Sequence, residues 1–361
     1  MYISLTMPML YEEAMKKIIW TCFLIVGVVS ALLGSPFPAD IDSLILRGID
    51  LTYNSRFDSA MHCFQYLIDR YPDHPAGYFY QAATVQSKIM DYESEQWESE
   101  FYALSDKALA VGHARIDSND QDPWVYYYTG SVYAYIGLYQ AKRGKLIPGF
   151  KNAKKGVSLL EQSIKMDSTV YDACMGIGNY QYWSGKFYKY LKWLPWISDE
   201  RKRGIALIER AMHLGKYSYW IGVNNLAWIE YDRGNFRRAL ALFGEGLARY
   251  PGSRFFLWGM ADTYFKIKDY AHAIPLYEKI IGQIQNAPYN NGYNDVVCRF
   301  KLVRAYYWSE NYEMAMRHCS AILNRKLDPE IADRLGDRRE QANKYYIKAR
   351  RIVKQKNHKL F

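Results

Sequence analysis

One pattern of small and bulky residues occurs twice in succession in this chain, and it constrains the fold more than any other sequence feature. The stretch 220–251 predicts two helices joined by a polar turn, with small residues at fixed places between bulky ones. The same residue types return after 34 residues. The paired positions are Leu226 and Met260, Ala227 and Ala261, Ala239 and Ala273, and Phe243 and Tyr277. A fixed period of this length predicts stacked helix pairs that share one continuous core.

The pattern resembles the tetratricopeptide repeat, whose signature is W-x2-L-G-x2-Y, then A-x3-F, then P. The match covers about Asp40 to Leu327 and is strongest in the first, fifth, sixth and seventh units. The resemblance implies an all-α, right-handed superhelical solenoid of about seven helix pairs over residues 40–328, followed by a C-terminal capping helix. It also implies a concave inner face lined by the first helix of each pair. The three middle units depart from the period, and inserts in them are the expected cause.

Composition and charge agree with a packed, elongated domain. Half of the residues are hydrophobic and 16% are aromatic, and the formal net charge is +10. Asp333–Phe361 contains ten Lys or Arg against three acids, so the repeat body is nearly neutral. Nucleic-acid-binding proteins spread their basic residues along the binding face. No nucleic-acid partner is therefore expected.

Residues 1–34 resemble a leader with a secretory signal peptide. Met15-Lys16-Lys17 precedes an apolar run, Ile18–Leu33, that is short for a membrane span. We expect translation to start at Met15 and the mature chain to be exported, either to the periplasm or out of the cell. The alternative is an uncleaved membrane anchor.

The middle of the chain carries three departures from the repeat. The acidic run Asp91–Glu100 is interpreted as a solvated helix face, with the second helix of that unit around Phe101–Ala110. In the third unit an insert is expected before a second helix at Lys154–Lys165. The fourth unit has an aromatic insert at Gly185–Asp199 that either covers the array or contacts a partner.

After Asp328-Pro329 the chain predicts one final amphipathic helix within residues 329–361. Its apolar residues recur at helical spacing. Such a helix suits a cap that buries the last core face of a solenoid. Its basic outer face is either solvated or attracted to an anionic membrane surface. The apolar stripe is Ile331, Leu335, Ala342, Tyr345, Ala349 and Ile352.

The sequence contains no catalytic or metal-binding signature. It has no H-E-x-x-H, G-x-x-x-x-G-K-[ST] or G-x-S-x-G motif, and its seven His are scattered. We therefore expect no enzymatic activity, no cofactor and no metal. The four cysteines after the leader are not spaced as zinc ligands. Cys298 and Cys319 are expected on the two helices of one unit. They either form a disulfide or remain buried free thiols.

The expected function is a non-enzymatic interaction scaffold that holds a peptide, protein or glycan in a concave aromatic groove. Aromatic side chains give contact area at low entropic cost, and amides give directional hydrogen bonds. The alternative for these rings is that they pack against one another. The alternative function is a membrane-associated envelope assembly factor. The predicted groove residues are Trp124, Tyr127, Tyr135, Asn179, Tyr182, Trp183, Asn224, Trp228, Tyr231, Trp258, Asp262, Phe265, Arg304, Tyr307 and Trp308.

Overall fold

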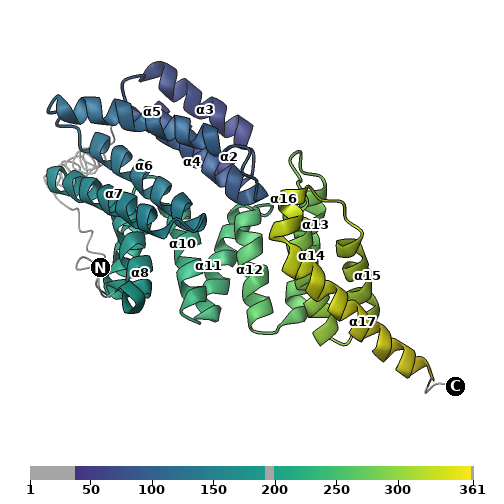
Figure 1. Ribbon diagram of the computed structural model, residues 1–361. Helices are drawn as coiled ribbons and strands as arrows, with labels where there is room; N and C mark the ends of the chain where they lie inside the picture. Colours follow the sequence, from purple (N-terminus) through teal and green to yellow (C-terminus); the bar gives the residue numbers. More distant parts are fainter. Residues whose placement is uncertain (1–36, 192–198, 359–361) are drawn as a thin grey trace, which may run out of the picture.

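The computed structural model describes residues 37–191 and 199–358, and within these ranges the regular elements are helices, with no strand (Figure 1). The expected leader, residues 1–34, lies outside the described residues. The helices are α2 (Ala39–Tyr53), α3 (Phe57–Arg70), α4 (Pro75–Tyr92), α5 (Glu98–Asp117), α6 (Pro123–Lys142), α7 (Leu146–Met166), α8 (Ala173–Leu191), α9 (Arg201–Leu214), α10 (Tyr219–Asp232), α11 (Phe236–Arg249), α12 (Arg254–Lys266), α13 (Tyr270–Gln285), α14 (Tyr293–Trp308), α15 (Tyr312–Leu323), α16 (Pro329–Arg334) and α17 (Gly336–His358).

Successive helices pack as seven pairs, from α2–α3 to α14–α15, and each pair packs on the next. The first helices α4, α6 and α8 also contact one another in order, as do α10 and α12. This confirms the all-α, right-handed superhelical solenoid of seven helix pairs. In Figure 1 the chain starts with α2–α5 at the top, descends through α6–α8 at the left, and runs to the right through α10–α17.

Small residues hold the two helices of a unit close together. A Cβ added to Gly130 of α6 would lie 2.8 Å from the carbonyl oxygen of Gly156 of α7. A Cβ on Gly178 of α8 would lie 2.6 Å from the carbonyl oxygen of Gly204 of α9. Backbones therefore meet directly in these two units, because a glycine has no side chain to separate them. Gly176, on the same helix as Gly178, instead lies against the Leu160 side chain of α7.

Two expected boundaries in the middle units are wrong. The second helix of the third unit begins at Leu146, not at Lys154, so the residues expected as an insert are largely helical. The second helix of the second unit is Glu98–Asp117, longer than the expected Phe101–Ala110. These units exceed 34 residues chiefly because their helices are longer. The aromatic insert is helical up to Leu191, and residues 192–198 lie outside the described part of the chain.

The interpretation of Asp91–Glu100 as a solvated helix face is also wrong. Helix α4 ends at Tyr92, Glu93 adopts a left-handed conformation with φ of 51°, and α5 starts only at Glu98. Asp91 is buried and binds Arg254 of α12, with 2.8 Å between Oδ1 and Nε. Residues 93–97 in the middle of the run form a turn between helices, and the carboxylates of Asp91, Glu93 and Glu95 bind distant cations.

The short α16 and the long α17 follow the seventh pair. Helix α17 packs on α15 and α14, and Ile331, Leu335, Ala342 and Ala349 are all buried there. The predicted stripe therefore covers the last helix pair, which is the geometry expected of a cap. The opposite face of α17 is exposed and basic.

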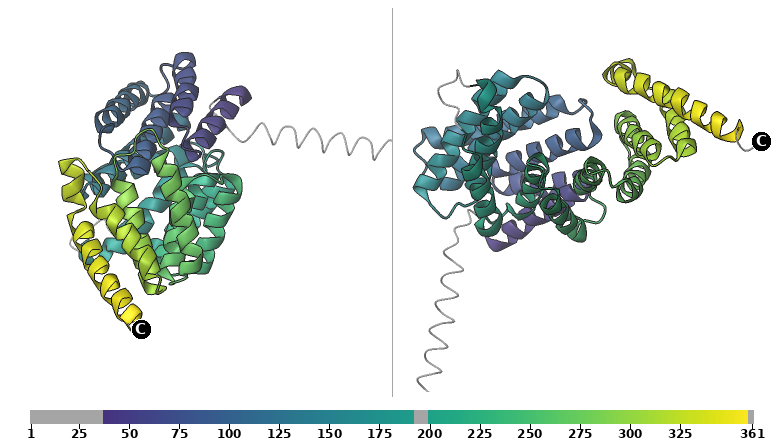
Figure 2. Two further views of the ribbon diagram at one scale, coloured as in Figure 1. Left: turned by 90° about the vertical axis from the view of Figure 1, so that its right-hand side faces the viewer. Right: turned by 90° about the horizontal axis from the view of Figure 1, so that it is seen from below.

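The superhelix is compact enough for its two halves to touch. Asp42 of α2 accepts hydrogen bonds from Lys216 and Tyr217, which precede α10. Asp50 accepts from Arg249 and Tyr250, at the end of α11. Further on, Asn294 of α14 donates to the Asp91 carbonyl oxygen at 2.8 Å. These partners are 174 to 203 residues apart in the chain, so the first two units close against the later ones. Figure 2 shows the arrangement from two further sides.

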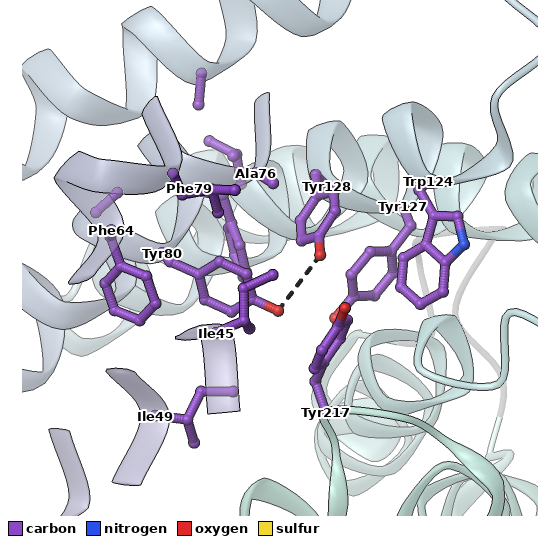
Figure 3. Packing of buried hydrophobic residues seen from close by; sticks show 14 of the residues in the cluster. Ile45, Ile49, Phe64, Ala76, Phe79, Tyr80, Trp124, Tyr127, Tyr128 and Tyr217 are labelled. Atoms are coloured by element: carbon purple, nitrogen blue, oxygen red, sulfur yellow. Dashed lines mark hydrogen bonds between the residues drawn. The ribbon is translucent and has the colours of Figure 1, made fainter. Parts of the chain in front are cut away.

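Aromatic side chains fill the core where these halves meet. Tyr80 and Tyr128 lie with their hydroxyl oxygens 3.4 Å apart, and Tyr217 comes from the opposite half to pack beside Tyr127 and Trp124 (Figure 3). The core thus includes residues from both halves. None of the described helices is apolar enough over a sufficient length to cross a bilayer.

Candidate ligand cavity

A cavity of about 1910 Å³ lies on the concave face of the superhelix. Its wall is built mainly from the first helices of the units, α2, α4, α6, α8, α10, α12 and α14, with α7 along one side. Pockets for drug-sized molecules enclose roughly 300–1,000 Å³. This cavity is larger, so an extended ligand fits its size better than a single small molecule.

Several of the predicted groove residues meet in this cavity, although their helices are far apart in the chain. They come from α6, α8, α10 and α12, so these residues span the third to the sixth unit. The residues that line it are Tyr127, Tyr135, Asn179, Trp183, Asn224, Trp228, Trp258 and Asp262.

The structure places the other predicted residues elsewhere. Trp124 and Tyr182 are buried in the core, and the Tyr182 hydroxyl donates to Asp232 at 2.9 Å. Tyr307 packs against Tyr345 of α17, with 5.0 Å between ring centroids. The Tyr307 ring of α14 therefore faces the cap helix instead of the cavity. Among the described residues, Trp124, Tyr182, Tyr231, Phe265, Arg304, Tyr307 and Trp308 are not part of the cavity wall.

The aromatic part of the wall is held rigid by the core behind it. Trp228 packs edge-on against Phe243, with 5.3 Å between ring centroids, and Trp258 packs against Tyr277. Burial raises the pKa of Tyr135 to about 12, so this phenol stays neutral. The wall therefore offers fixed, uncharged rings as contact area.

Two polar atoms in the wall lack a hydrogen-bond partner within the described chain. They are the Oδ1 atom of Asn224 and the hydroxyl oxygen of Tyr180, and both atoms are buried. A buried polar group without a partner costs about 1–3 kcal/mol.

The acidic residues of the wall are compensated by protein groups. Asp91 binds Arg254, and Glu93 binds Lys142 with 2.6 Å between oxygen and nitrogen. Asp262 accepts from Lys301 at 3.1 Å and also from the Tyr277 hydroxyl. Asp172 accepts from Ser218 and two backbone N–H groups, while burial raises its pKa.

The sequence reasoning missed a set of residues at one end of the cavity, where α4 and α6 end and α7 begins. We call Met90, Leu138, Leu146 and Ile147 the mouth residues; they are exposed and line the cavity. Lys151, Lys154 and Lys155 of α7 line it next to them. One signal was available, because residues 123–160 contain six Lys or Arg and no Asp or Glu.

No group of three or more His, Cys, Asp or Glu is arranged to hold a metal ion in the described ranges. Cys63, Cys174, Cys298 and Cys319 are free thiols. Burial raises the pKa of Cys319 to about 12 and that of Cys298 well above its usual value. Both thiols are therefore protonated and unreactive at neutral pH.

Comparison with known proteins supports a tetratricopeptide-repeat protein. Residues 224–291, which span α10–α13, match the tetratricopeptide-repeat family model. A chain of the APC/C hetero-tetramer Cut9–Hcn1 is similar in structure, with a TM-score of 0.55 and 12% sequence identity. The match covers 85% of this chain and 49% of that one, so this chain spans about half the length of that protein. The likeness shows the fold.

Two bacterial repeat proteins are similar at lower scores. They are a thermophilic TPR protein from Thermus thermophilus and the C-terminal part of a TPR repeat-containing protein from Cytophaga hutchinsonii. The first is 17% identical with a TM-score of 0.39, and the match covers 62% of this chain and 98% of that one. The second is 16% identical with a TM-score of 0.41, and the match covers 80% of this chain and 97% of that one. No curated protein matches the sequence.

Proposed function

We propose that this chain is a non-enzymatic scaffold that holds a segment of another protein in the cavity on its concave face. The observation that carries the proposal is the cavity itself: about 1910 Å³, open, and walled by rigid aromatic rings and amides from units three to six. Tetratricopeptide-repeat proteins are in general interaction scaffolds without enzymatic activity. Extended concave surfaces are the usual binding faces of solenoids.

Site-specific photo-crosslinking in cells tests where the partner binds. A photo-crosslinking residue, p-benzoylphenylalanine, replaces Leu138, which is 52% exposed and lines the cavity. The matched control carries the same residue in place of Tyr66, which is 57% exposed on α3 and outside the wall. We expect an adduct from position 138 only, in which tryptic mass spectrometry finds peptides of a second polypeptide. Equal adducts at both positions, or none at position 138, would contradict binding in the cavity.

A glycan is the other ligand class that aromatic and amide side chains suit. It would give an adduct at position 138 whose added mass a glycosidase removes and in which tryptic mass spectrometry finds no second polypeptide.

We further propose that the protein works outside the cytoplasm. The support is the signal-like pattern of residues 1–34, with Lys16 and Lys17 before the apolar run. Intact-mass analysis of the periplasmic fraction tests this proposal. We expect the mass of a mature chain whose first residue lies between Leu32 and Asp40. A cytosolic chain that retains residues 15–33 would contradict the proposal.

The alternative function is a membrane-associated assembly factor. It is favoured by the outer face of α17, where Lys348, Arg350 and Arg351 are exposed. Clusters of basic residues on a helix attract anionic lipid headgroups. Cell fractionation distinguishes the two functions, because only the alternative predicts that the protein sediments with membranes; high salt should release it, since binding through α17 is electrostatic.

A further inference from the structure

The mouth residues form an apolar surface that lacks a cover in the described structure. Leu146 and Ile147 at the start of α7 are 51% and 63% exposed, and Leu138 of α6 and Met90 of α4 are exposed beside them. Groups of large apolar side chains exposed on a protein surface mark interaction sites, and these four line the same cavity. Their position at one end of the cavity indicates that a ligand in the cavity would also cover them.

Beside these residues the wall carries positive charge without compensation. Lys151 of α7 and Arg338 of α17 line the cavity, and neither has a carboxylate partner in the part of the chain that the structure describes. Lys155 donates to the Tyr133 hydroxyl, a neutral group. Since the wall's own carboxylates are already bound by protein groups, the remaining charge attracts an anionic ligand.

The side-chain amides of the wall favour a polypeptide over a lipid. Asn179 and Asn224 line the cavity, and an amide group carries both donors and an acceptor. A peptide backbone carries an N–H and a C=O at every residue, whereas an acyl chain carries neither. The concave wall therefore fits a polypeptide better than a bilayer surface or a lipid tail.

We propose that the cavity binds an acidic, amphipathic polypeptide segment. Its apolar side chains cover the mouth residues and the aromatic wall, its carboxylates lie near Lys151, Lys155 and Arg338, and its backbone hydrogen-bonds to the amides of Asn179 and Asn224. This inference rests on the proposed scaffold function and adds the chemistry of the partner.

Selection from a displayed library of random peptides against the full chain tests the inference. We expect the enriched peptides to combine Asp or Glu with Leu, Ile or aromatic residues. Synthetic peptides of the enriched sequences are then measured against variants. Lys151→Glu with Lys155→Glu should weaken their binding about tenfold, because attraction becomes repulsion at a partly exposed site. Raising the salt concentration should weaken wild-type binding as well.

Two matched controls separate the cavity from the general surface. Lys165→Glu changes an exposed lysine of the same helix, α7, outside the cavity wall and should leave binding unchanged. Leu146→Ser with Ile147→Ser should weaken binding, while Leu214→Ser, at a residue 52% exposed on α9, should not. All these positions are exposed, so melting temperatures should stay at the wild-type value.

The possible outcomes separate this inference from the scaffold function. Enriched peptides without acidic residues, or binding that is unchanged in the double lysine variant, would overturn the inference. The proposed scaffold function would not be affected by either result. No enriched peptide, together with no adduct at position 138, would overturn both. Phosphatidylcholine vesicles containing phosphatidylglycerol serve as the lipid probe. If the wild type binds these vesicles and the double lysine variant does not, the mouth residues and lysines bind a membrane surface. That result would overturn the inference.

Discussion

His318 of α15 shows how burial sets the charge of a single residue. Its ring stacks on Tyr306, with 5.6 Å between centroids, and its Nδ1 atom lies 3.4 Å from the Arg299 guanidinium. Burial, and then the charge of Arg299, lower the pKa of His318 to about 4. Arg317 lowers this pKa further, and the carboxylates Glu278 and Asp295 partly oppose the shift. The imidazole is therefore neutral in the folded protein at neutral pH.

The lowered pKa predicts acid sensitivity from this one residue. An unfolded histidine takes up a proton near pH 6.5, and the folded His318 does so only near pH 4. Its contribution to stability is thus complete above about pH 6.5 and is lost as the pH falls to about 4. We expect His318→Asn to remove about 2 kcal/mol of the pH dependence of unfolding over this window, measured by urea denaturation. His62→Asn, at an exposed histidine, should change nothing; equal slopes for wild type and His318→Asn would contradict the assignment.

At the scale of elements, direct backbone contact explains why the middle units have longer helices. Helices α6 and α7 meet at Gly130 and Gly156, and again at Gly137 and Gly149. Each contact permits another turn of helix to pack at the same short distance. The pair therefore runs along its full length instead of ending after the usual repeat.

Substitution of one glycine tests this packing. Gly130→Ala places a Cβ 2.8 Å from the Gly156 carbonyl oxygen, and the helices must separate. We expect a loss of about 1–3 kcal/mol in the free energy of unfolding. Gly282→Ala in α13 is the control, because a Cβ there has no neighbour among the described residues within 4 Å. That change should be neutral or stabilise by up to about 1 kcal/mol. Similar losses in both variants would show that backbone contact is not the cause.

At the scale of the whole molecule, a few ion pairs hold the two halves of the superhelix together. Asp91 of α4 and Arg254 of α12 form a buried bidentate pair, and the Arg254 guanidinium lies 5.2 Å from the Tyr92 ring centroid. Burial raises the pKa of Asp91, and Arg254 opposes that rise. Arg334 of α16 reaches Glu93 at 3.4 Å in the same region. The cavity lies between the halves that these contacts join.

Removal of Arg254 should loosen this closure. Arg254→Met leaves the Asp91 carboxylate buried without its partner, which costs about 3–5 kcal/mol. We expect a lower melting temperature and a larger radius of gyration by X-ray scattering. Adding Asp91→Asn should recover part of the loss, because the buried charge is gone. The control Arg249→Met removes the exposed pair with Asp50 and should cost under about 1 kcal/mol. An unchanged radius of gyration in Arg254→Met would mean that the halves stay together without this pair.

The sequence by itself determined the local architecture. Gly48 of α2 meets the Phe64 ring of α3. The stripe residues Ile331, Leu335, Ala342 and Ala349 of the predicted cap are buried. These contacts join residues on the same or adjacent helices, so the periodicity of a helix is enough to foresee them. The boundaries of the regular units follow from the same period.

The tertiary structure alone decided which residues meet in the cavity. The superhelix accumulates a small rotation at every unit, and no single unit shows where the array returns to itself. Trp228 and Trp258 therefore share a wall with the partly buried Tyr135, while Trp124 of the same helix as Tyr135 is buried in the core and is not part of the wall. The lysines of α7 left a signal in the composition of residues 123–160. That they share a cavity with Trp228 and Trp258 depends on contacts between residues far apart in the chain, such as Asp91 with Arg254, 163 positions apart, which helical periodicity does not encode.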